Sequence, residues 1–154
     1  MKTHQIVKFS NIVCLVLLAV ILVLQFTPFG CVDGQGISIG TYIWFPTEHT
    51  EVTAYMQSNV GESFNVLSLV GSHCLILVGA VFAAFFFLKN TESINCTIFS
   101  VIAGIGGLWG YGTKAAYQLG NNWTMHLLIC ILLTVAAAVG LVVHIRKVTQ
   151  DKKK

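Results

Sequence analysis

Charged residues are scarce in this chain, and acidic ones are missing from its apolar stretches. Only 10% of the 154 residues are charged, whereas 55% are hydrophobic. A soluble domain carries roughly 25% charged residues, so too few polar side chains are present here to cover a water-facing surface. The composition excludes an ordinary soluble domain and predicts a protein whose surface is covered largely by lipid.

The absence of carboxylates from the apolar stretches bears on function. All six Asp and Glu residues lie between or after these stretches. Proton-coupled carriers generally use a buried carboxylate, and membrane hydrolases use an acid or base pair. We therefore expect the protein not to be an enzyme.

Cysteine motifs are also missing. No CxxC pair occurs, and only Cys31 lies in a predicted outer loop, which excludes a disulfide framework within that loop unless Cys31 pairs between chains. The other four cysteines are expected to be small apolar packing residues. We expect neither a cofactor nor a resident metal.

Four apolar stretches fill most of the chain, at residues 9–29, 64–88, 96–117 and 123–143. A helix rises ~1.5 Å per residue, so ~20 residues cross a hydrocarbon core of ~30 Å. The sequence predicts an all-α membrane protein, one four-transmembrane-helix bundle spanning residues 1–154. The first stretch starts like a signal peptide, but no small-x-small cleavage site follows it, so we expect it to stay as a span.

Lysine and arginine gather on one side of these stretches. If the N-terminus is cytoplasmic, eight of the nine lie inside, and the long outer loop at residues 30–63 holds no cation. The positive-inside rule then predicts a multi-pass protein of the plasma (inner) membrane, with both termini cytoplasmic. Cations placed at membrane edges, and not on one folded face, also argue against a nucleic-acid partner.

The outer loop is the one connection long enough for structure of its own. Turn residues Asp33 and Gly34, followed by alternation, predict extended chain over residues 32–45 and a possible short β-hairpin. Thr47 is a natural N-cap for one helix over residues 48–59. The aromatic residues of the loop suit an extracellular cap at headgroup level.

Glycine is concentrated in the third stretch. Gly106 and Gly110 form a GxxxG pair, and Gly107 lies on an adjacent face. Small residues allow the close backbone approach that holds helices together in lipid. We expect these glycines to pack within the bundle, with Ala136 and Gly140 of the fourth stretch as the partner surface. A homodimer interface, and a pore or hinge, remain alternatives.

A few polar residues interrupt the apolar stretches. His73, Lys114 and His126 are the titratable candidates for a ligand-binding pocket in the outer half of the bundle. Interhelical hydrogen bonding by the histidines, and snorkelling of Lys114 to the headgroups, are the alternatives. Cys74 follows His73 and Cys130 lies one turn after His126, so a shared metal site is a further alternative.

Two resemblances follow from these features. The four crossings with a long first outer loop resemble the claudin and peripheral-myelin-protein layout in topology only, because Gly107-Leu108-Trp109 lies in a span here and the loop has a single cysteine. The stretch at residues 11–28, the Val32-Asp33-Gly34 turn and residues 42–46 resemble uncharacterised small four-pass membrane proteins of Gram-positive bacteria. That resemblance implies no activity.

The sequence thus favours an integral membrane protein that acts without catalysis, by helix packing or by interaction with a partner. The partners expected are the lipid bilayer and either a second copy of the chain or another membrane protein. The alternative function is that of a small transporter or ligand-binding membrane protein that uses His73, Lys114 and His126.

Overall fold

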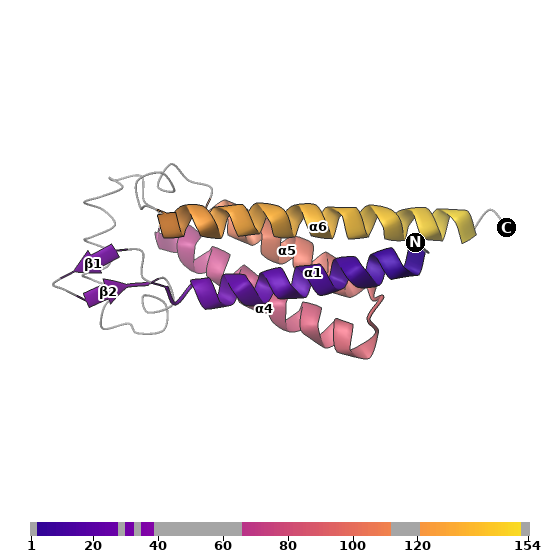
Figure 1. The fold of residues 1–154 in the computed structure, drawn as a ribbon, viewed down its shortest axis with the longest axis horizontal. Helices are drawn as coiled ribbons and strands as arrows, with labels where there is room; N and C mark the ends of the chain where they lie inside the picture. Colours follow the sequence, from indigo (N-terminus) through magenta and orange to yellow (C-terminus); the bar gives the residue numbers. More distant parts are fainter. Residues whose placement is uncertain (1–2, 28–29, 33–34, 39–65, 112–120, 152–154) are drawn as a thin grey trace.

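The computed structural model describes residues 3–27, 30–32, 35–38, 66–111 and 121–151. Within them the helices are α1 (Thr3–Leu24), α4 (Val66–Lys89), α5 (Ile94–Tyr111) and α6 (Asn121–Asp151). They lie side by side as a bundle (Figure 1). The start of α1 and the end of α6 share one end of the bundle, here named the terminal end. The opposite end, where α1 leads into the strands, is named the hairpin end.

Three of the helices are long and apolar enough to cross a membrane, over Gln5–Leu24, Gly71–Lys89 and Thr124–Thr149. Helix α5 is apolar as well, but its segment Ile94–Gly110 is shorter. It packs against both α4 and α6. The chain is therefore a helical bundle with several candidate membrane spans, as an integral membrane protein requires.

The helix boundaries differ from those expected. Helix α1 begins at Thr3 and not at residue 9, and α5 and α6 each begin two residues early. Helix α1 ends at Leu24 and not at residue 29, because the chain turns there: Phe26 N–H donates to the Val23 carbonyl and the Thr27 hydroxyl to the Leu24 carbonyl. Pro28 comes next, and the residue before a proline disfavours helix. Helix α6 continues to Asp151, eight residues beyond the predicted span. Hydropathy marks where lipid ends, whereas a helix can continue into water.

Small residues allow the helices to approach closely. A Cβ atom added at Gly79 of α4 would lie 2.6 Å from the Ala103 Cβ and 2.8 Å from the Phe99 carbonyl oxygen, both on α5. A Cβ atom at Gly140 of α6 would lie 2.6 Å from the Ser10 hydroxyl of α1. Lipid offers no hydrophobic drive for helices to associate, so close packing must supply the attraction between them.

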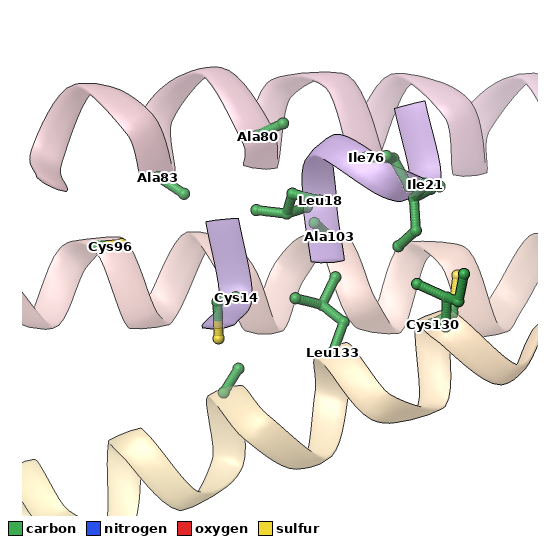
Figure 2. Close-up of a cluster of buried hydrophobic side chains, with 12 residues drawn as sticks. Cys14, Leu18, Ile21, Ile76, Ala80, Ala83, Cys96, Ala103, Cys130 and Leu133 are labelled. Carbon is green, nitrogen blue, oxygen red and sulfur yellow. The ribbon is translucent and has the colours of Figure 1, made fainter. Parts of the chain in front are cut away.

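The core and the lipid-facing surface differ in side-chain size. The buried cluster is rich in alanine and cysteine, with two larger aliphatic residues from α1, one from α4 and two from α6 between them (Figure 2). Large apolar side chains such as Phe9, Val81 and Trp109 are instead exposed. This distribution suits a bundle that is surrounded by hydrocarbon. Large apolar side chains gain no hydrophobic free energy there by moving from the surface into the core.

A short hairpin follows α1. Strands β1 (Gly30–Val32) and β2 (Gln35–Ile37) pair antiparallel, with Gly30 opposite Ile37 and Val32 opposite Gln35. The extended chain thus starts two residues earlier than expected. The helix expected over residues 48–59 lies outside the described residues, so an extracellular cap stays a prediction.

Candidate functional site

Asn11 of α1 fastens the terminal end of the bundle. Its side chain is fully buried, and its Nδ2 donates to the carbonyl oxygens of Thr91 (3.1 Å) and Ser93 (3.2 Å) in the α4–α5 connection. Its Oδ1 accepts a 2.8 Å hydrogen bond from the Thr97 hydroxyl of α5. One amide thus ties α1 to α5 and to the α4–α5 connection with three hydrogen bonds. These bonds use the amide within the fold, which makes Asn11 a structural residue and not a binding one.

The hairpin end contains a second set of buried polar side chains, here named the polar layer. Its members come from α4, from α6 and from the residue that directly follows α1, and they are almost fully shielded: Gln25 (0% exposed), Ser72 (1%), His73 (2%) and His126 (1%). Burying polar groups costs free energy unless hydrogen bonds replace those made with water. Two of these groups, the Gln25 amide and the Ser72 hydroxyl, have no hydrogen-bond partner among the described residues, so their burial requires an explanation.

These residues lie at one level of the bundle because each is about one helical turn from a shared layer of the core. A Cβ atom at Gly107 would touch Cys130 and lie 3.6 Å from the Ile76 side chain, so these residues share a level. Ile21 is drawn at that level in Figure 2 and belongs to the same cluster.

His73 precedes Ile76 by three residues, His126 precedes Cys130 by four, and Gln25 follows Ile21 by four. At ~1.5 Å per residue, each side chain lies ~5 Å nearer the hairpin end than that core layer.

Gln25 differs from Asn11 in its hydrogen bonding. Neither atom of its buried side-chain amide has a hydrogen-bond partner among the described residues, and the same holds for the Ser72 hydroxyl. A buried polar group without a partner destabilises a fold by about 1–3 kcal/mol. The amide can donate two hydrogen bonds and accept two. Chemically, the polar layer can thus bind a small polar group that offers both donors and acceptors.

The polar layer includes two of the three predicted ligand-binding residues. His73 and His126 are both buried at this level, whereas Lys114 lies outside the described residues. Sequence reasoning missed Gln25. A signal for it was present, because Gln25 is a long amide side chain between Leu24 and Phe26 in an otherwise apolar run.

The shared metal site does not form. Cys74 is exposed on α4 while its neighbour His73 is buried, so the two side chains lie on different faces. Within residues 3–27, 30–32, 35–38, 66–111 and 121–151, no three His, Cys, Asp or Glu side chains cluster closely enough to hold a metal ion. Adjacent residues of a helix point ~100° apart, which separates His73 from Cys74.

The glycines of α5 face neighbouring helices of the same bundle. A Cβ atom at Gly106 would lie 2.6 Å from the Leu75 Cβ of α4, and one at Gly107 would meet the Cys130 sulfur of α6. Gly110 is buried too. The sequence predicted that Ala136 and Gly140 of α6 pack against these glycines. The α6 residue that contacts Gly107 is instead Cys130.

Ala136 and Gly140 of α6 pack chiefly against α1. Gly140 lies against Ser10 of α1, with the Thr97 methyl of α5 beside it. The Ser10 hydroxyl donates to the Ala136 carbonyl at 2.8 Å. The helix crossings decide this pairing: α5 contacts α6 through Gly104 and Gly107, whose α6 neighbours are Thr134 and Cys130. Ala136 and Gly140 thus hold α1 against α6.

No family model matches the chain, and no curated protein or solved structure matches it either. A function for the chain therefore has to be inferred from the geometry of the polar layer and the physical chemistry of buried amides. The resemblance to small four-pass proteins of Gram-positive bacteria stays a prediction.

Proposed function

We propose that this chain is a four-pass, non-catalytic protein of the cell membrane that binds a small polar ligand from the outer side, at the polar layer. The observation that carries the proposal is the fully buried Gln25 amide, which has no hydrogen-bond partner among the described residues. His73 and His126 lie at the same level. A ligand that hydrogen-bonds to Gln25 would recover the free energy that burial of the amide costs.

The orientation follows from charge. Lys8 near the start of α1, Lys89 at the end of α4, and Arg146 and Lys147 near the end of α6 all belong to the terminal end (Figure 1). Positive charges at this end favour a cytoplasmic position for it. The hairpin end, and with it the polar layer, then faces the outside.

The contrast with Asn11 favours ligand binding over packing as the role of the polar layer. The three hydrogen bonds of Asn11 offset the free-energy cost of burying its amide. Gln25 is buried as completely and gains no such bonds among the described residues. A side chain kept in a destabilising environment is typical of a functional site.

Association with a second copy or with another membrane protein remains a further prediction. The glycines that most readily suggest a homodimer, Gly106 and Gly107, lie against Leu75 and Cys130 of the same chain. A partner would therefore have to contact the large, exposed apolar side chains of the bundle.

The orientation has a direct test in cells. A Lys154→Cys variant should react with a membrane-impermeant maleimide only after the membrane is permeabilised, because the terminal end is cytoplasmic. A Glu51→Cys variant should react in intact cells, because residues 30–63 are outside. Mass spectrometry of the labelled site separates the introduced cysteines from the native ones, and labelling of the Lys154→Cys site in intact cells would reverse the orientation.

The Gln25→Leu variant tests the polar layer. Leucine is similar in size to glutamine and removes the unsatisfied amide, so the free energy of unfolding in mixed micelles should rise by about 1–2 kcal/mol. Gln25→Glu, which places a charge at the same buried position, should instead destabilise the protein. A loss of stability in Gln25→Leu would mean that the amide is hydrogen-bonded within the fold.

Binding is measured on the purified full chain in lipid nanodiscs. Free amino acids, sugars and short-chain carboxylates are added separately, and the melting temperature is recorded. At least one class should raise the melting temperature of the wild type, as a ligand that binds only the folded state does. The effect should disappear in Gln25→Leu and His126→Leu but persist in Val78→Leu, a change on the exposed side of α4. Equal responses of wild type and Gln25→Leu to every class would refute the proposal.

A further inference from the structure

A surface hollow of about 370 Å³ opens at the terminal end, between the start of α5 and the last turns of α6. Polar residues from two parts of the chain line it: Asn90 and Glu92 before α5, and His144 and Lys147 on α6. Ile94 and Val148, both exposed, form its apolar edge. The hollow is remote from the polar layer, which lies at the hairpin end.

The hollow combines positive and negative groups. The Lys147 ammonium lies 4.0 Å from a carboxylate oxygen of Glu92, and both side chains are partly exposed. Helix α5 begins at Ile94, and the first N–H groups of a helix lack partners within it and favour anions. A phosphate at this place would meet the Lys147 ammonium and these N–H groups together.

His144 supplies a second, independent observation. It is only 8% exposed although it lines the hollow, and its Nε2 has no hydrogen-bond partner among the described residues. A buried imidazole nitrogen beside the Lys147 ammonium can donate to a phosphate oxygen. The Glu92–Lys147 pair is long and partly exposed, and such ion pairs contribute little to stability. The two side chains can therefore separate to bind a ligand at little cost.

We propose that this hollow binds the zwitterionic headgroup of a membrane phospholipid, with the phosphate at Lys147, His144 and the start of α5 and a primary amine at Glu92. An ethanolamine headgroup carries these two groups on one short ethylene link. A glycerol headgroup lacks the amine. The Glu92 carboxylate would then lie beside the negative phosphate without a positive group to bind. A choline headgroup carries a cation that cannot donate hydrogen bonds to Glu92. The apolar edge at Ile94 and Val148 suits the glycerol and acyl parts of the lipid.

The test is made on the purified full chain in detergent, where melting temperature is measured with added dioleoyl lipids that carry ethanolamine, glycerol or choline headgroups. The ethanolamine lipid should raise the melting temperature by about 3 °C more than either of the others. In Glu92→Gln the ethanolamine lipid should lose this advantage over the glycerol lipid. In Lys147→Gln all three lipids should lose most of their effect. Arg146→Gln removes the neighbouring cation, which does not line the hollow, and should keep the wild-type ranking.

Three outcomes would overturn the proposal: equal effects of the three lipids on the wild type, an ethanolamine advantage that survives Glu92→Gln, or an equal shift from inorganic phosphate alone. The last would assign the hollow to a free anion. If Lys147→Gln does not fold, Lys147→Arg, which keeps the positive charge, should preserve the ranking. The proposed orientation assigns the hollow to the cytoplasmic leaflet, but the ranking in detergent does not depend on it. Failure here would therefore leave the polar-layer proposal unaffected.

Discussion

Replacing Gly79 with leucine should cost the protein about 3 kcal/mol of unfolding free energy or more. The new Cβ would lie 2.6 Å from the Ala103 Cβ and 2.8 Å from the Phe99 carbonyl oxygen. Real Cβ atoms essentially never approach other heavy atoms so closely, and a backbone carbonyl in a helix cannot swing aside as a side chain can. Helices α4 and α5 must therefore move apart, and in lipid no hydrophobic force compensates for the contacts they lose.

The measurement is reversible unfolding of the purified chain in mixed micelles. Val78→Leu is the matched control, because Val78 is the preceding residue of α4 and is 47% exposed, so the change should alter stability little. Two variants with smaller changes in side-chain size refine the result. Gly79→Ala should destabilise the protein less than leucine does, and adding Ala103→Gly should restore part of the loss by removing the nearest atom. Equal stabilities of Gly79→Leu and Val78→Leu would show that α4 and α5 are not packed through Gly79.

The second large effect is expected for Asn11→Leu, at about 3 kcal/mol of destabilisation. Leucine fills a similar volume but leaves the Thr97 hydroxyl and the Thr91 and Ser93 carbonyls without the partner that Asn11 provides. Unsatisfied buried groups are costly, and here one buried and two partly buried groups depend on one side chain. The α4–α5 connection should also loosen from α1.

Amide hydrogen exchange at the α4–α5 connection, together with unfolding in mixed micelles, measures both effects. Ser100→Ala is the control, because the Ser100 hydroxyl donates to the Cys96 carbonyl one turn earlier in its own helix. That change should be almost neutral, since the helix already satisfies the Cys96 carbonyl. If Asn11→Leu is as stable as Ser100→Ala, the Asn11 hydrogen bonds contribute little to the fold.

The sequence predicted the helices more accurately than it predicted the residues of the polar layer. Apolar length located the helical stretches, because a bilayer demands a fixed length of apolar residues. It misplaced the end of α1 by five residues, since the turn at Phe26 and Thr27 involves local hydrogen bonds that hydropathy does not detect. It selected His73 and His126 by residue type and overlooked Gln25, whose burial depends on which face of α1 meets the other helices.

The chain's composition and charge pattern, taken alone, predicted a helical protein with candidate membrane spans and cations on one side of them, because the cost of burying charge in hydrocarbon acts on each segment separately. The tertiary structure decided which small residues meet. Gly79 lies against α5, Gly107 against Cys130, and Gly140 against Ser10. It also decided that the Asn11 amide is hydrogen-bonded and the Gln25 amide is not, among the described residues. These outcomes depend on how the helices are rotated and crossed, and that geometry follows from all the side chains packing at once.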